Sequence, residues 1–154
     1  SSDVCSSDLY RVHTLYILYN MNKNHLRLID ANLNRLREGI RVVEDIFRYI
    51  YNDKEISTKL KSLRHIARTK NYYELLETRD VENDVLRESI KSEQNREDLN
   101  SILIANFKRA QESSRVLEEL TKLSSIEDSE NFKYIRYELY NLEIVLTKIT
   151  SNSK

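Results

Sequence analysis

Residues 31–46 read ANLNRLREGIRVVEDI, and residues 105–120 read ANFKRAQESSRVLEEL. Aligned at an offset of 74 with no gap, the two stretches share seven of sixteen positions, and most of the shared residues are polar. Unrelated helices coincide mostly at Leu, Ala and Glu, so the match indicates an internal repeat. The identical pairs are Ala31/Ala105, Asn32/Asn106, Arg35/Arg109, Glu38/Glu112, Arg41/Arg115, Val42/Val116 and Glu44/Glu118.

A weaker match follows each copy. Residues 60–66, LKSLRHI, align with residues 132–138, FKYIRYE, at an offset of 72, and share Lys61/Lys133 and Arg64/Arg136. Each repeat is therefore expected to hold a long helix, a short turn and a second helix, which predicts an all-α bundle of two tandem helical hairpins. The four main helices are predicted at 26–52, 54–73, 97–123 and 129–150, with repeat 1 at about 26–76 and repeat 2 at about 97–150.

Apolar residues support these helices, because they recur at spacings of four and three along one face. The stripes are Ile29, Leu33, Leu36, Ile40, Val43, Phe47 and Ile50 in the first helix, Leu103, Phe107, Ala110 and Leu117 in the third, and Phe132, Ile135, Leu139, Leu142 and Leu146 in the fourth. Asp53 is expected to cap the second helix, and Ser129 or Asp128 the fourth. Gly39 lies mid-helix, where glycine costs about 0.5–1 kcal/mol relative to alanine. Its repeat-mate Ser113 is also small, which favours close packing against another helix.

Composition narrows the class of protein. Proline is absent and 32% of residues are charged, which is typical of a helical bundle. The formal net charge is zero, which disfavours a nucleic-acid binder, because such proteins carry a basic excess. No apolar run is long enough to cross a bilayer. The single cysteine, Cys5, cannot form an internal disulfide, which suits a reducing compartment. We therefore expect a cytoplasmic protein that binds neither nucleic acid nor membrane.

Two segments depart from the helical pattern. Residues 1–20 combine the Ser/Asp tract SSDVCSSDL with the patch YRVHTLYILY, and they precede the only methionine, Met21. We interpret 1–20 as a non-native or upstream-derived leader and 21–154 as a single helical domain. The connector at about 77–96, which contains TRDVENDV, is the least periodic part and is predicted to be a loop that covers a ligand.

A polar stripe runs along the first helix through Asp30, Asn34, Arg37, Arg41, Glu44 and Arg48. A solvated face with short-range ion pairs is the plain explanation. However, the repeat keeps Asn, Arg and Glu at matching places, asparagine is a poor helix former, and the arginine fork suits phosphate or carboxylate. The chain has no glycine-rich phosphate loop and no zinc or di-iron spacing. We therefore predict a phosphate site built from side chains.

The predicted catalytic residues are the charged members of this face and their repeat-mates: Asp30, Glu38, Arg41, Glu44, Glu112, Arg115 and Glu118. The predicted substrate- and phosphate-binding residues are Asn32, Asn34, Arg35, Arg37, Arg64, Asn106 and Arg109. Arginines are expected to hold phosphates, and carboxylates to hold a metal or accept a proton, with no metal ligand assigned individually. The two long helices are expected to face each other about a pseudo-twofold axis.

Residues 27–47, RLIDANLNRLREGIRVVEDIF, resemble a family of small helical proteins of thiamine biosynthesis. The resemblance continues through LKSLRH at 60–65, ETRDVENDV at 77–85 and ANFKRAQESSRVLEE at 105–119. That family occurs alone or joined to thiamine-phosphate synthase, and it is identified as a hydroxymethylpyrimidine phosphate kinase. The resemblance implies that ATP and Mg²⁺ serve to phosphorylate 4-amino-5-hydroxymethyl-2-methylpyrimidine phosphate to the diphosphate, and it suggests thiamine-phosphate synthase as a partner. Self-association is left open.

The second copy departs from the first, since Arg37, Gly39 and Ile40 correspond to Gln111, Ser113 and Ser114. Two half-sites would therefore not bind the same group. The chain is too short for the (β/α)₈ barrel of the synthase, so the synthase reaction is not expected.

Two other hypotheses stay open. One is a non-catalytic helical module that docks onto a thiamine enzyme or dimerises, which predicts that the matched polar residues tolerate alanine. The other is a chorismate mutase-like enzyme, because HLRLIDANLNRL at 25–36 is loosely similar to the first helix of those proteins. The internal repeat argues against the second, and an assay with chorismate decides it.

Overall fold

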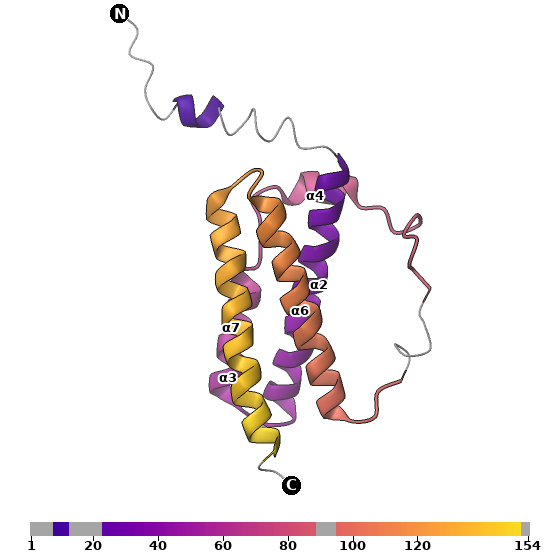
Figure 1. Cartoon of the computed structure of the whole chain (residues 1–154), viewed down its shortest axis with the longest axis vertical. Helices are drawn as coiled ribbons and strands as arrows, with labels where there is room; N and C mark the ends of the chain where they lie inside the picture. Colours follow the sequence, from indigo (N-terminus) through magenta and orange to yellow (C-terminus); the bar gives the residue numbers. More distant parts are fainter. Residues whose placement is uncertain (1–7, 13–22, 89–94, 152–154) are drawn as a thin grey trace, which may run out of the picture.

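The structure is a computed structural model that describes residues 8–12, 23–88 and 95–151, and within these ranges every regular element is a helix. Four long helices form the bundle in Figure 1: α2 (Lys23–Tyr49), α3 (Lys54–Ile66), α6 (Leu99–Thr121) and α7 (Ile126–Ser151), with the short α4 (Tyr72–Thr78) at one end. The predicted all-α bundle is confirmed. Residues 1–20, interpreted above as a leader, lie mostly outside the described residues; within this segment the structure describes 8–12, which are helical.

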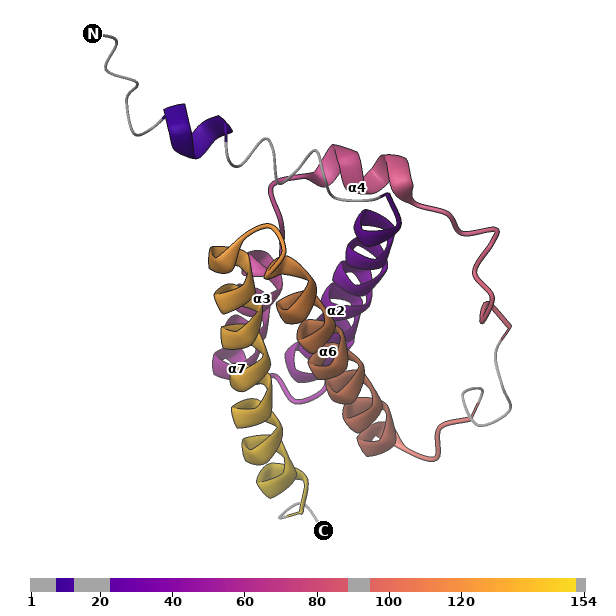
Figure 2. The same cartoon turned by 45° about the horizontal axis from the view of Figure 1, so that its top comes forward.

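Helices α2 and α6 run antiparallel and pack against each other, while α3 packs on α2 and α7 packs on α6 (Figures 1 and 2). The predicted apolar stripes meet in one core, in which Leu36, Ile40, Leu117 and Ile135 are fully buried. Ile50 is the exception, with 56% of its surface exposed, because α2 ends at Tyr49. No helix in the described ranges is both long enough and apolar enough to cross a membrane.

Gly39 lies at the contact between α2 and α6. A Cβ placed on it would lie 2.9 Å from the backbone oxygen of Asn106 and 3.3 Å from Cβ of Ala110. Real Cβ atoms essentially never approach a neighbour to 2.9 Å. The prediction that Gly39 permits close helix packing is therefore confirmed.

The second helix is shorter than predicted. It ends at Ile66 rather than 73, and the buried Ala67 closes it by donating its backbone N–H to the Leu63 carbonyl at 3.0 Å. Had the helix continued, Lys70 and Glu74 would have faced the core. Instead the chain turns after Ala67 and forms α4, a helix that was not predicted from the sequence. Helix α4 brings Leu75 into the core.

Of the two predicted helix caps, one is confirmed and the other is wrong. Asp53 caps α3 as predicted, since its Oδ1 accepts the Ile56 backbone N–H at 2.9 Å. The cap predicted for the fourth helix was wrong, because α7 begins at Ile126 and the Ser125 hydroxyl accepts the Asp128 N–H at 3.1 Å. Ser129 is buried, and its hydroxyl donates to the Glu118 carbonyl at 2.8 Å, which ties α7 to α6.

Candidate functional site

The polar residues that match between the repeats form the same buried ion pair in each hairpin. Arg64 on α3 donates to Glu44 on α2 at 2.8 Å, and Arg136 on α7 donates to Glu118 on α6 at 2.7 and 2.9 Å. The two carboxylate side chains are only 2% and 6% exposed. Each pair therefore fixes the second helix of a hairpin on the first.

The remaining matched residues surround these pairs. Arg41 lies 3.5 Å from Glu44, and Arg115 lies 3.0 Å from Glu118, each one helical turn before its carboxylate. Asn32 donates its side-chain amide to the Leu28 carbonyl at 2.9 Å, and Asn106 does the same to Ile102 at 2.8 Å. Much of the polar identity between the repeats thus serves the folding of each hairpin. The catalytic roles of Glu44 and Glu118 stay predictions.

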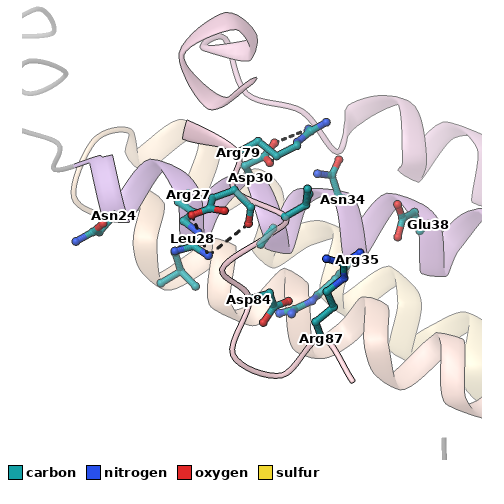
Figure 3. Close-up of a pocket in the computed structure, with 13 residues that line it drawn as sticks. Asn24, Arg27, Leu28, Asp30, Asn34, Arg35, Glu38, Arg79, Asp84 and Arg87 are labelled. Carbon is teal, nitrogen blue, oxygen red and sulfur yellow. Dashed lines mark hydrogen bonds and ion pairs between the residues drawn. The ribbon is translucent and has the colours of Figure 1, made fainter. Parts of the chain in front are cut away.

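A cavity of about 670 Å³ lies between α2, the end of α4 and the loop 79–87. Its volume falls in the range of about 300–1,000 Å³ that is typical of small-molecule sites. Four arginines and four carboxylates line it, which gives it the chemistry of a polyanion site with room for a cation. The lining residues, most of them labelled in Figure 3, are Asn24, Arg27, Leu28, Asp30, Ala31, Asn34, Arg35, Glu38, Arg79, Asp80, Val81, Asp84 and Arg87.

A two-bond ion pair joins the loop to α2. Arg79, the residue that ends α4, donates Nε and Nη2 to the two oxygens of Asp30 at 2.7 and 2.8 Å. Asp30 is nearly buried, with 8% of its side chain exposed. The hydrogen bond that Asp30 accepts raises the pKa of the Arg79 guanidinium above its ordinary value. Asp30 therefore positions the loop rather than standing open to a ligand.

The loop then folds around Asp80. Its carboxylate accepts the Asn83 side-chain amide at 2.8 Å and the backbone N–H groups of Glu82 and Asn83 at 3.2 and 3.1 Å. The bond from the Asn83 amide is the main cause that lowers the pKa of Asp80. Arg27 of α2 donates to the Asn83 carbonyl at 3.2 Å, so the loop is tied to α2 a second time.

Two arginines in the cavity have no such structural bond. Arg35 and Arg87 are exposed, and neither side chain forms a hydrogen bond or ion pair with another described residue, although the Arg87 backbone N–H donates to the Asp84 carbonyl at 3.2 Å. In Figure 3 the two side chains come from α2 and from the loop and reach the same part of the cavity, beside Asp84. They are the cations best placed to receive phosphate oxygens.

A second cavity, of about 380 Å³, adjoins the first along the same face of α2. Asn34 and Glu38 line both cavities, so these two residues mark the boundary. Its other lining residues are Arg37, Arg41, Val42 and Arg64. Together the two cavities form a continuous polar region on repeat 1 that could hold two anionic molecules side by side.

The structure brings the predicted residues together only in part. The first cavity holds Asp30, Asn34, Arg35 and Glu38, and the second holds Arg37, Arg41 and Arg64. Glu44 lines a separate cavity of about 310 Å³ at the α2–α3 turn, and Asn32 is buried. The second-repeat residues line neither of the adjoining cavities: Asn106, Arg109, Glu112, Arg115 and Glu118.

Sequence reasoning missed Arg27, Arg79, Asp80, Asp84 and Arg87. The signal was present, because the connector was predicted to cover a ligand and its charged residues were available for a role. The sequence also explains why the first cavity is built on repeat 1. At the repeat offset Asp30 corresponds to Ile104, so the second copy has no carboxylate to hold an arginine such as Arg79.

No group of three His, Cys, Asp or Glu side chains among the described residues could hold a metal ion alone. Mg²⁺ that arrives with a nucleotide needs only one or two protein carboxylates, because phosphates and water complete its shell. Glu38 is exposed and lies where the two cavities join. Glu38 therefore offers one exposed carboxylate at this boundary, and the prediction of ATP and Mg²⁺ stays a prediction.

A family model described as the ThiD2 family matches residues 27–145. The chain is 42% identical over 122 residues to the thiamine-phosphate synthase of Thermosynechococcus vestitus, a match that covers 79% of the chain and 35% of that relative. It is 35% identical over 134 residues to the Prochlorococcus marinus synthase (86% and 38%) and 36% identical over 138 residues to that of Rhodopirellula baltica (84% and 37%). The chain thus spans little more than a third of these relatives. No solved structure matches it.

Proposed function

The chain belongs to the ThiD2 family, and from this premise we propose that it is a phosphotransferase of thiamine biosynthesis. Its relatives' name, thiamine-phosphate synthase, supports a role in that pathway. The proposed reaction transfers the γ-phosphoryl group of ATP to 4-amino-5-hydroxymethyl-2-methylpyrimidine phosphate. An oxygen of the monoester phosphate forms the new P–O bond, the bond to ADP breaks, and the pyrimidine diphosphate results.

The observation that carries the proposal is the pair of adjoining cavities lined by arginines on repeat 1. Two phosphorylated molecules must meet in this reaction, and their combined negative charge has to be offset while the phosphoryl group moves. Arg35 and Arg87 serve one anion in the first cavity, and Arg37 and Arg41 line the second. The two anions would then meet beside Asn34 and Glu38, at the boundary between the cavities.

The chemistry changes the role expected of the carboxylates. The nucleophile is a phosphate oxygen that is already ionised at neutral pH, so no side chain has to remove a proton. Glu38 is then assigned to the cation rather than to proton transfer. Mg²⁺, held by Glu38 and the phosphates, would neutralise charge on the transferred group.

The repeat supplies a matched control for the test. Arg35 lines the first cavity, whereas its repeat-mate Arg109 is also an exposed arginine but lines neither cavity. Turnover is measured with ATP, Mg²⁺ and hydroxymethylpyrimidine phosphate, with the diphosphate detected through a separate thiamine-phosphate synthase. Arg35→Ala should lower kcat/KM by roughly a hundredfold or more, the usual effect of removing one transition-state contact. Arg109→Ala should stay near wild type, and equal losses in both variants would contradict the assignment.

The alternative is a non-catalytic module that docks onto thiamine-phosphate synthase. Its basis is that nearly two thirds of each relative lies outside the matched region, so in those proteins the matched part is joined to a larger chain. That hypothesis predicts no product and no shift of the melting temperature with ATP or the pyrimidine phosphate, in a protein that is folded and helical.

A further inference from the structure

Helix α7 carries a second stripe of large side chains on the face turned away from the core. Its buried stripe holds Phe132, Ile135, Leu139, Leu142 and Leu146, and Figures 1 and 2 show α7 at the edge of the bundle. On the opposite side Tyr134, Tyr137 and Ile144 are 54%, 54% and 57% exposed. We call the whole series the outer stripe: Glu130, Tyr134, Tyr137, Asn141, Ile144 and Lys148.

The outer stripe runs along a single face of α7. Its members are separated by four, three, four, three and four residues, an average of 3.6, which is the repeat of an α-helix. Large side chains such as Tyr134, Tyr137 and Ile144, exposed together on one face, form the kind of surface that marks a contact with another molecule. A polar residue such as Asn141 within a seam is a known device for fixing register.

One tyrosine of the outer stripe, Tyr137, is also held in place before any partner arrives. The rings of Tyr137 and Tyr140 pack edge to face at 6.0 Å, and the Arg136 guanidinium lies 4.9 and 5.7 Å from their centres. Arg136 is itself bonded to the buried Glu118. An aromatic surface fixed in this way loses little conformational entropy on docking.

The outer stripe is complementary to itself when two copies run antiparallel. With the twofold axis at the level of Leu139, Glu130 faces Lys148, Tyr134 faces Ile144, and Tyr137 faces Asn141. A parallel pair would instead set Glu130 against Glu130 and Lys148 against Lys148. We propose that this face of α7 is an interface between two copies of the chain, paired antiparallel in this register.

Charge supports a second copy as the occupant. In this register Glu130 of each copy lies opposite Lys148 of the other, so the antiparallel pair places opposite charges together at both ends of the stripe. The stripe is about 27 Å long at 1.5 Å per residue, which is small for a stable dimer, so a micromolar, concentration-dependent equilibrium is expected. Loop 79–87 lies at the other edge of the bundle in Figure 1, so the dimer leaves the proposed site open and does not depend on the proposed function.

The first test measures mass by sedimentation velocity on the full chain, from about 1 to 200 µM, which brackets a micromolar equilibrium. The wild type should be mostly dimeric at the upper end, and Tyr137→Glu and Ile144→Glu should be monomeric there. Tyr73→Glu is the control, since Tyr73 is a 77% exposed tyrosine on α4, outside the stripe. A wild type that stays monomeric throughout, or a dimer that survives both stripe variants, would overturn the proposal.

The register is tested by charge reversal. Glu130→Lys should raise the dimer dissociation constant by about tenfold, because two end pairs per dimer become repulsive. Lys148→Glu should do the same, and the double variant should return to within about twofold of wild type. A double variant as weak as either single one would refute the antiparallel register. Circular dichroism of each variant should match the wild type, because all of these side chains are exposed.

Discussion

Replacing Asp30 with asparagine tests how the loop that carries Arg87 is held over the cavity. Asp30→Asn keeps the shape of the side chain, but it removes the charge and sets an amide against the Arg79 guanidinium. The two bonds it disturbs are 2.7 and 2.8 Å long, and hydrogen bonds to charged groups contribute about 1.5–3 kcal/mol each. Because 37% of the Arg79 side chain is exposed, water replaces part of this, and we expect a net loss of about 2 kcal/mol.

A loss of about 2 kcal/mol lowers the ratio of docked to undocked loop by roughly thirtyfold. Backbone amide exchange at Glu82 and Asn83, whose N–H groups bond to Asp80 within the loop, should accelerate by up to that factor. If the docked loop is the binding-competent state, KM for the pyrimidine phosphate or for ATP should rise by no more than the same factor.

Glu55→Gln is the control, because it breaks an ion pair of similar length, 3.0 Å to Lys59, between side chains that are 80% and 56% exposed. That variant should change neither exchange nor KM. If Asp30→Asn leaves loop exchange and KM at wild-type values, the Asp30–Arg79 pair does not hold the loop and the reasoning fails.

Three further predictions concern the fold. Gly39→Ala should lower the melting temperature, because overpacking costs about 1–3 kcal/mol against a gain in helix propensity of about 1 kcal/mol; a higher melting temperature would show that α2 and α6 are not in close contact. Arg64→Met should lower the free energy of unfolding in urea by about 3 kcal/mol, because it leaves the buried Glu44 carboxylate with only the longer, 3.5 Å contact to Arg41, and adding Glu44→Gln should recover much of that loss; additive losses would count against the buried pair. Burial raises the pKa of Asp128 in the folded state above its ordinary value of 3.8. The ionised carboxylate therefore destabilises the fold: the full stability is present below pH 3.8, and part of it is lost as the pH rises through the folded-state pKa. Asp128→Asn should therefore melt higher than wild type at pH 7 and equal it near pH 3, and a lower melting temperature at pH 7 would reverse the sign.

The helices of this protein could be predicted because each buried stripe keeps one spacing over many turns. The break between α3 and α4 could not be predicted, because it is set by the packing of Leu75 into the core and not by a local signal such as proline or glycine. The start of α7 was misplaced by three residues because serine occurs at 124, 125 and 129, and only the packing of Ser129 against Glu118 decides between them.

The site was predictable where it lies on one helix. Asn34, Arg35 and Glu38 share a face of α2 at helical spacing, and they line the first cavity. Arg79 could not be assigned, because its contact with Asp30 joins residues 49 apart in the chain.

The polar identities of the repeat were interpreted mainly as chemistry, whereas the structure shows a structural use for several of them. Glu44 follows Val43 and lies four residues after Ile40 and three before Phe47, all buried, so its position beside the apolar stripe already pointed to burial. A carboxylate there needs a cation from a neighbouring helix, and the weaker match at Arg64 and Arg136 supplied it in both copies.

The most direct test of the central claim is phosphorus NMR of the purified full chain with ATP, Mg²⁺ and hydroxymethylpyrimidine phosphate. The proposed kinase activity predicts that the monoester signal is replaced by two coupled signals of the pyrimidine diphosphate, while ATP is converted to an equal amount of ADP. Unchanged ATP and monoester, in a protein whose circular dichroism is helical, would contradict it and leave the docking module as the better explanation.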